Sequence, residues 1–349
     1  MLNPGDRRDR DAAARPPAAG SPGVPFRAIR LALIGLAAGA AAANAQAAGG
    51  RTGGIRLQPV ASGPLSSTLV QATPGPGGEI FGIAERPQQL VKIVRRGAAL
   101  QVQPQTVPAT LLYPASVHYD GRALQVLDLG GPAVHRLRAS ATTSELGSLD
   151  VGRAVDFCLV RGRTYAYRPR ETALVAVYSP ADRLVGQFGA QFGSGPPIRR
   201  EAMSRARLVC DPDGGRVVVV ARFTGEVRAY SADGRLLWNR PVPGVRPIVF
   251  VTSGERQVTF MPAPGGSHVL IGASLLGRDR LLVQYGLPRP ERAAEYTSVE
   301  THILSLANGA DLVHQSDLPV LVAVGQDLAF SVSQPGGRLV LNRLVAAGR

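Results

Sequence analysis

The sequence predicts an all-β protein, a six-bladed β-propeller of four-stranded antiparallel blades that is closed by an N-terminal strand. Three observations predict this fold. A unit of about 50 residues recurs along the chain, each unit holds short apolar runs separated by turns, and glycine (41) and proline (28) are abundant among the 349 residues. A propeller blade is covered on both faces by its neighbours, so its inner strands need apolar runs rather than alternation.

The repeat is clearest between two segments in the middle of the chain. Residues 158–185 align with residues 210–237 at a shift of 52 without a gap, and nine of the 28 positions are identical. The second copy contains four short apolar segments separated by turn sequences, which is the pattern of consecutive hairpins. The predicted strands are Ala206–Cys210, Arg216–Val220, Val227–Tyr230 and Arg235–Trp238.

The same template fits on both sides of this pair, and it gives six units in total. The further segments are Ile80–Ile83 with Leu90–Ile93, Leu124–Leu127 with Leu137, Leu281–Tyr285 with Val299–Leu304, and Leu328–Val332 with Leu339–Leu344. The sixth unit runs out after three strands, so we expect Ile55–Val60 to supply its outer strand and to remove an open sheet edge. The alternative is a β-sandwich, which has hairpins but gives no reason for a period near 50.

The first 45 residues predict a polar leader followed by a secretory signal. Arg27 and Arg30 accompany an apolar stretch from Ile29 to Ala43, and Ala43-Asn44-Ala45 is a small-x-small cleavage pattern. The stretch is too short and too rich in alanine to span a bilayer stably. We therefore expect cleavage after Ala45, a single propeller domain over residues 46–349, and a periplasmic or extracellular location. An uncleaved N-terminal anchor is the alternative, and no later apolar run is long enough to cross a membrane.

The formal net charge of +14 does not by itself indicate nucleic-acid binding. Lys92 is the only lysine, and 38 of the 39 basic residues are arginine. No run of four basic residues occurs, and aromatic residues, which would stack on bases, make up 5% of the chain. We expect a dispersed, solvated basic surface and no nucleic-acid partner.

The cysteines and histidines give little support for chemistry. Cys158 and Cys210 occupy equivalent places in two repeat units. An oxidising compartment favours a disulfide, but equivalent residues on neighbouring blades point the same way around the axis, so we expect two buried small side chains instead. The histidines show no zinc-ligand spacing. They are His118, His135, His268, His302 and His314.

Part of the chain resembles a known family. Val177–Leu184 with Phe188-Gly189, the glycine-proline loop Gly193–Pro197, and the turn Asp211–Val217 resemble the strands and loops of bacterial six-bladed NHL-like propellers. The resemblance extends over most of residues 55–345 and is clear in the third and fourth units. That family often closes the second strand of a blade with an aspartate, and here only Asp128 fits. The resemblance implies the propeller fold and no particular activity, since members do many things.

The least ordinary loop is Pro196–Arg207, which joins the outer strand of one predicted blade to the inner strand of the next. Such connections help form one rim of the central pocket, where propellers usually bind ligands. The long connection Pro241–Ser267 is expected over the same rim. A cationic rim suits an anionic ligand or a carboxylate-bearing partner; a solvated loop is the other interpretation. The candidate ligand-binding residues are Arg199, Arg200, Glu201, Arg205 and Arg246.

These features favour a monomeric, non-catalytic binding or interaction module, whose partner is a protein or an anionic small molecule. No catalytic residue, metal ligand or cofactor is assigned from the sequence. The alternative is a metal-dependent hydrolase or lyase with ligands that converge on the propeller axis. The acidic residues that could be its metal ligands are also typical of turns and strand ends. They are Asp156, Glu201, Asp211, Asp279 and Asp317.

Overall fold

The computed structural model describes residues 54–346, apart from residues 65–67, 86, 108–110, 139–143, 254–256, 290–291, 326 and 333–336. The leader and signal predicted over residues 1–45 therefore lie outside the described residues. Among the described residues, no helix has the length and apolar character that a membrane span requires.

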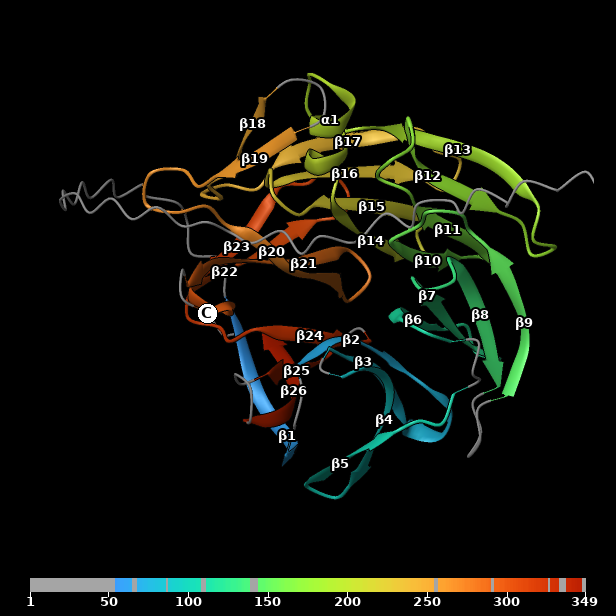
Figure 1. Ribbon diagram of the computed structural model, residues 1–349. Helices are drawn as coiled ribbons and strands as arrows, with labels where there is room; N and C mark the ends of the chain where they lie inside the picture. The colour runs from blue at the N-terminus through green and yellow to red at the C-terminus, as the bar shows by residue number, and fades with distance from the viewer. Residues whose placement is uncertain are drawn as a thin grey trace, which may run out of the picture. The chain divides into compact units, whose positions relative to one another are not determined.

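The described chain is built almost entirely of β-strands, and four-stranded antiparallel sheets recur along it (Figure 1). Consecutive strands pair in each sheet. One sheet holds β6 (Pro114–Tyr119), β7 (Leu124–Asp128), β8 (Ala133–Arg138) and β9 (Ser144–Asp150). The next holds β10 (Asp156–Val160), β11 (Arg163–Tyr167), β12 (Ala173–Tyr178) and β13 (Leu184–Ala190).

Two further four-stranded sheets follow, with a hairpin between them. The first is β14 (Ala206–Asp211), β15 (Arg216–Ala221), β16 (Glu226–Ser231) and β17 (Leu236–Pro241). The hairpin is β18 (Val249–Ser253) and β19 (Gln257–Met261). The second sheet is β20 (Val269–Leu276), β21 (Arg280–Arg289), β22 (Arg292–Ser305) and β23 (Asp311–Gln315).

An eight-stranded sheet contains both ends of the described chain, in the order β2-β3-β4-β5-β1-β26-β25-β24. Strand β1 (Ile55–Pro64) pairs antiparallel with β26 (Arg338–Ala346), while a single parallel pair, Ser62 with Ala99, joins it to β5. The other strands are β2 (Leu69–Pro74), β3 (Ile80–Glu85), β4 (Gln88–Arg96), β5 (Ala99–Pro104), β24 (Leu321–Val324) and β25 (Leu328–Val332). A short 3-10 turn, Pro76–Gly78, lies between β2 and β3.

Strand β15 shows why the inner strands are apolar runs. Val217 and Val219 pack with residues of the β10–β13 sheet, whereas Val218 and Val220 pack with residues of the β20–β23 sheet. All four valines are fully buried. Since alternate residues of a strand point to opposite faces, each face of the sheet is covered by a neighbouring sheet. The expectation of runs in place of alternation is confirmed for this strand.

The first strands of the sheets contact one another in sequence order. Strand β2 contacts β6, β6 contacts β10, β10 contacts β14, β14 contacts β20, β20 contacts β24, and β24 contacts β2. The sheets share one strand order, so the turns that join second strands to third strands come together at one end of this arrangement. That end holds the residues that follow β3, β7, β11 and β15, together with the β21–β22 hairpin.

A disulfide joins Cys158 of β10 to Cys210 of β14, and the expectation of two unbridged thiols is wrong. The expectation relied on the rotation between neighbouring sheets, which turns one thiol away from the other. First strands converge near the centre, however, and the two Cα atoms are 5.7 Å apart, within the range that a disulfide spans. The short distance between the two strands therefore allows the disulfide, although equivalent side chains on neighbouring sheets point the same way around the axis.

Candidate functional site

Three of the predicted site residues lie on a short helix. The segment Pro196–Arg207, expected to be a loop, contains α1 (Pro197–Met203), which carries Arg199, Arg200 and Glu201. Helix α1 contacts both strands of the β18–β19 hairpin. Glu201 accepts a hydrogen bond from Arg170 Nε at 2.8 Å. The Nε atoms of Arg199 and Arg200 are buried and have no hydrogen-bond partner among the described residues.

Arg246 lies in the connection between β17 and β18, beside His268. Its backbone N–H donates to His268 Nδ1 at 2.9 Å, and its carbonyl accepts from the His268 backbone N–H, also at 2.9 Å. Burial, followed by the positive charge of Arg246, lowers the pKa of His268. The imidazole is therefore held neutral, with Nδ1 as an acceptor.

The β18–β19 hairpin is a second element that sequence reasoning missed inside a predicted connection, Pro241–Ser267. Phe250 and Phe260 face each other across its two strands, with ring centroids 5.1 Å apart. Phe223, in the turn after β15, contacts both rings at about 6 Å. This aromatic cluster fixes the hairpin beside the turn that carries Arg222.

Arg205, Arg207 and Arg222 form the arginine mouth, the name used below for these three residues. The backbone N–H of Arg222 donates to the Arg205 carbonyl at 2.7 Å, which continues the β14–β15 pairing beyond the strand ends. Arg207 Nη1 is 3.9 Å from the Asp156 carboxylate. Among the described residues, the guanidinium groups of Arg205 and Arg222 form no ion pair. The Arg222 guanidinium lies over the Phe223 ring, 5.5 Å from its centroid. Two of the three charges are thus not paired with a carboxylate among the described residues.

The environment of Arg222 reflects this crowding of like charges. Arg222 is an exposed residue, so solvent reaches its side chain. Protein atoms nevertheless surround the guanidinium on most sides. Burial, and then the charges of Arg207 and Arg205, lower the pKa of Arg222, while Tyr296 and Glu85 act in the opposite direction. Arginine keeps its proton in proteins despite such shifts, so the mouth presents a concentrated positive charge.

Glu85 and Tyr296 complete the surroundings of Arg222. Glu85 is the last residue of β3, and Tyr296 lies on β22 opposite Pro288 of β21. The Tyr296 ring lies against Gly286, where an added Cβ would meet it at 2.3 Å. Burial raises the pKa of Tyr296, the charge of Arg222 opposes this, and the charge of Glu85 adds to it. The tyrosine is therefore close to both charges.

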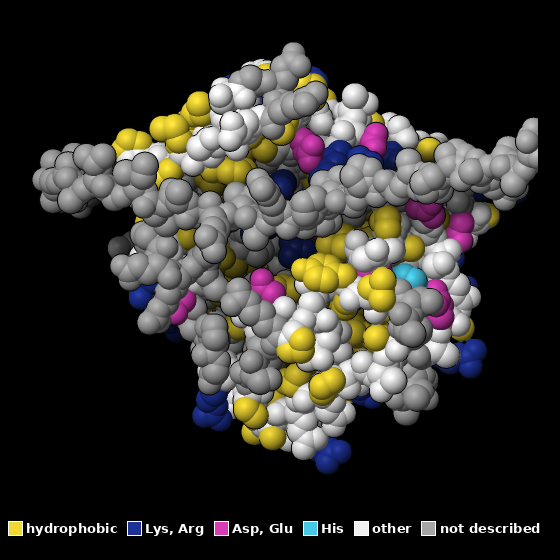
Figure 2. All heavy atoms as spheres, in the orientation of Figure 1, with side chains coloured by type: hydrophobic (Ala, Val, Ile, Leu, Met, Phe, Trp, Pro, Cys, Tyr) yellow, Lys and Arg dark blue, Asp and Glu magenta, His cyan; other side chains and the backbone are white. Residues whose placement is uncertain are grey.

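The surface of this face agrees with these contacts. Figure 2 shows basic side chains gathered in a central hollow, with acidic side chains near them. A patch of hydrophobic side chains lies towards the region where Figure 1 places β18 and β19. Val249, Val251 and Met261 of the hairpin are between 43% and 49% exposed and contribute to such a surface.

The five carboxylates named as metal-ligand candidates are not brought together. Asp156 and Asp211 are buried and accept hydrogen bonds from backbone N–H groups. Glu201 pairs with Arg170, and the exposed Asp279 lies 3.5 Å from Arg280. Asp317 is exposed. Within the part of the chain that is described, no group of three or more histidine, cysteine, aspartate or glutamate side chains could hold a metal ion.

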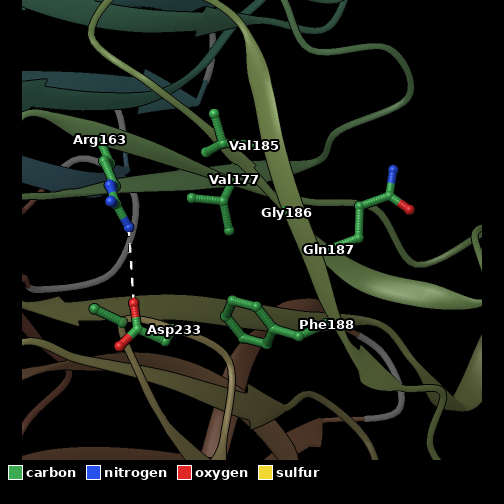
Figure 3. Close-up of a pocket in the computed structure, with 8 residues that line it drawn as sticks. Arg163, Val177, Val185, Gly186, Gln187, Phe188 and Asp233 are labelled. Carbon is green, nitrogen blue, oxygen red and sulfur yellow. Dashed lines mark ion pairs between the residues drawn. The ribbon is translucent and has the colours of Figure 1, made fainter.

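A small cavity of about 170 Å³ lies elsewhere, between β13 and the turn after β16. Val177, Val185 and Phe188 supply its apolar lining, and Arg163 faces Asp233 across it at 3.8 Å (Figure 3). Ligand pockets are typically about 300–1,000 Å³. The cavity is too small for most ligands, so the arginine mouth remains the candidate site.

Solved β-propellers have a similar arrangement. A member of the DUF4221 family from Bacteroides vulgatus has a TM-score of 0.52 at 9% identity, covering 83% of this chain and 98% of that one. Virginiamycin B lyase from Staphylococcus aureus has a TM-score of 0.49 at 8% identity, covering 84% and 100%. An oxidoreductase named glucose dehydrogenase from Thermus thermophilus has a TM-score of 0.48 at 14% identity, covering 84% and 100%.

The likeness to the DUF4221 protein is at 9% identity, so it shows the fold alone. The described residues have a β-propeller fold, and the activities of the neighbours do not transfer with it. No protein-family model matches this sequence, and no curated protein sequence matches it.

Two of the residues that sequence reasoning missed lie at the ends of second strands: Glu85 is the last residue of β3, and Arg222 directly follows β15. In the NHL-like propellers that the sequence resembles, an aspartate often closes the second strand of a blade. Here that position is Ala84 in one unit and Ala221 in another. Glu85 and Arg222 are the next residues in each case. A charged residue directly after an apolar run could therefore have indicated a residue of the candidate site. Tyr296 had no such signal, because its place depends on the length of the β21–β22 hairpin.

Proposed function

We propose that this protein is a non-catalytic binding module that takes an anionic small molecule, or a carboxylate-bearing partner, at the arginine mouth. The observation that carries the proposal is the placement of Arg205 and Arg222 side by side, with neither guanidinium paired to a carboxylate among the described residues. Guanidinium groups bind carboxylate and phosphate by charge-assisted, often bidentate, hydrogen bonds. An anion at this point would relieve the repulsion between them.

The predicted rim residues support the same site. Arg199 and Arg200 have buried Nε atoms without acceptors among the described residues, and α1 holds them beside the segment that leads to Arg205. Glu201 orients Arg170 through their ion pair. Arg246 adds positive charge where the neighbouring connection leaves β17. The arginines raise the local electrostatic potential and attract anions to the mouth, whereas the charge of Glu201 acts against this and is balanced by Arg170.

The scaffold in this proposal is a six-bladed propeller of the NHL-like kind, closed by β1 as the outer strand of the last blade. The antiparallel pairing of β1 with β26 supports the closure, and the successive contacts of the first strands support the blade number. A closed ring leaves no open sheet edge at the junction and holds the mouth rigid.

The proposed location is the periplasm or the outside of the cell, after cleavage following Ala45. The disulfide between Cys158 and Cys210 supports this, since such bonds persist in oxidising compartments. The protein would act there as a monomer without a nucleic-acid partner. The alternative of a metal-dependent hydrolase or lyase draws no comparable support, because arginines and not converging carboxylates occupy the mouth.

The experiment is a calorimetric titration with citrate, at low ionic strength, of the wild-type protein and of Arg222→Gln. We expect saturable binding by the wild type and an affinity lower by about tenfold or more in Arg222→Gln, because a hydrogen bond to a charged group is lost. Arg235→Gln is the matched control, since Arg235 is an exposed arginine in the turn between β16 and β17. Equal losses in both variants, or no citrate binding by the wild type, would refute the proposal.

A further inference from the structure

Resting on the proposed function, we infer that the ligand of the arginine mouth is zwitterionic: its carboxylate binds Arg205 and Arg222, and its ammonium group binds Glu85 and Tyr296. An amino acid or a short peptide has this chemistry. The inference follows from the placement of an acid, a base and an aromatic residue at the same end of the ring of first strands, with neither charge in an ion pair among the described residues.

Glu85 and Arg222 reach this point by equivalent routes. Glu85 ends β3, the second strand of its sheet, and Arg222 directly follows β15, the second strand of another. The first strands of these two sheets, β2 and β14, do not adjoin in the sequence of contacts, because β6 and β10 lie between them on one side and β20 and β24 on the other. The two residues therefore lie on opposite sides of the ring formed by the first strands, at the same end of it.

Neither Glu85 nor Arg222 is in an ion pair among the described residues, although the Arg222 guanidinium lies over the Phe223 ring. Among the described residues, Glu85 forms no ion pair, and its carboxylate, which belongs to an exposed residue, influences Arg222 without contacting it. Surface charges that serve only solubility are usually dispersed, whereas these two have opposite signs and share one hollow. A ligand with charges of both signs would satisfy each of them at once, which an anion alone cannot do.

Tyr296 lies in the extended part of the β21–β22 hairpin, opposite Pro288. The strands have 10 and 14 residues, while most first and second strands have five or six. The absence of a side chain at Gly286 leaves room for the tyrosine ring. The face of such a ring attracts an ammonium group, and its hydroxyl accepts a hydrogen bond. The tyrosine thus adds to Glu85 as a partner for a cation.

The test compares three probes that differ in one charge each: phenylalanine, 3-phenylpropanoate without the ammonium group, and phenethylamine without the carboxylate. We expect the wild-type protein to bind phenylalanine at least about tenfold more tightly than either single-charge probe. In Glu85→Gln, affinity for the zwitterion should fall about tenfold, whereas affinity for 3-phenylpropanoate should stay equal or rise because a repulsive carboxylate is gone.

Glu171→Gln is the matched control, because Glu171 is an exposed acid in the turn between the second and third strands of another sheet. It should leave all three affinities unchanged. If 3-phenylpropanoate and citrate bind and the ammonium group adds nothing, this inference is overturned while the proposed function stands. If neither 3-phenylpropanoate nor citrate binds, the proposed function is refuted, and the inference that rests on it is refuted with it. Equal effects of Glu85→Gln on all probes would also overturn the inference.

Discussion

Replacing Asp156 with alanine is expected to lower the free energy of unfolding by about 3–5 kcal/mol, because buried donors lose their acceptor. The carboxylate joins three consecutive sheets. It accepts hydrogen bonds from the Ser116 hydroxyl of β6 at 3.0 Å, from the Phe157 backbone N–H of β10 at 2.9 Å, and from the Leu208 backbone N–H of β14 at 2.9 Å. Only 3% of the residue is exposed, so water cannot replace it.

Urea unfolding of the wild type, Asp156→Ala and Asp156→Asn measures this effect. Asparagine keeps one acceptor oxygen, so we expect an intermediate loss. Asp279→Ala is the control, because that carboxylate is 83% exposed and its removal should change the unfolding free energy by less than about 0.5 kcal/mol. Similar stabilities for Asp156→Ala and Asp279→Ala would show that the carboxylate does not link the sheets.

The second large effect is expected from the disulfide. Breaking the bond between Cys158 and Cys210 should lower the unfolding free energy by about 2–4 kcal/mol, since it releases a loop that constrains the unfolded chain. The two residues are 52 positions apart, so the loop is long. The measurement is the urea midpoint with and without dithiothreitol.

The Cys158→Ala/Cys210→Ala double variant provides the comparison for that measurement. Its midpoint should be insensitive to the reductant and close to that of the reduced wild type, because both lack the bridge. A thiol titration of the denatured, unreduced wild-type protein should find no free thiols. Two free thiols, or an unchanged midpoint on reduction, would contradict the assigned bond.

The inner strands were predictable because burial on both faces leaves a direct mark in the sequence. Arg216–Val220 was expected and β15 is Arg216–Ala221; Val227–Tyr230 was expected and β16 is Glu226–Ser231. Short runs of valine and leucine that are bounded by glycine turns are typical of strands buried on both faces. The repeat added the order of the strands, since copies of one unit share one topology.

The elements that escaped prediction are those that no repeat unit contains. Helix α1 has seven residues and lies in a segment of arginines and prolines without a helical apolar period. The β18–β19 hairpin has only two strands, and its buried rings, Phe250 and Phe260, are separated by the turn. The two elements contact each other, and the hairpin also packs against Phe223. Sequence alone does not reveal these contacts.

The candidate residues chosen from the sequence and those of the arginine mouth overlap only in part. Arg205 is paired with Arg222 in the arginine mouth, whereas Arg246 lies beside His268. Arg222, Glu85 and Tyr296 come from three different sheets or hairpins, and their meeting depends on how the first strands are arranged. Sequence spacing cannot show such a convergence, because the residues are separated by more than 70 positions.

The most direct measurement of the central claim is the anomalous diffraction of crystals that contain selenate, an anion with the shape of sulfate. The account predicts a selenium peak within hydrogen-bond distance of the Arg205 and Arg222 guanidinium groups in the wild-type protein, and its loss in Arg222→Gln. Selenium peaks only at scattered arginines outside the mouth, such as Arg235, would contradict the account.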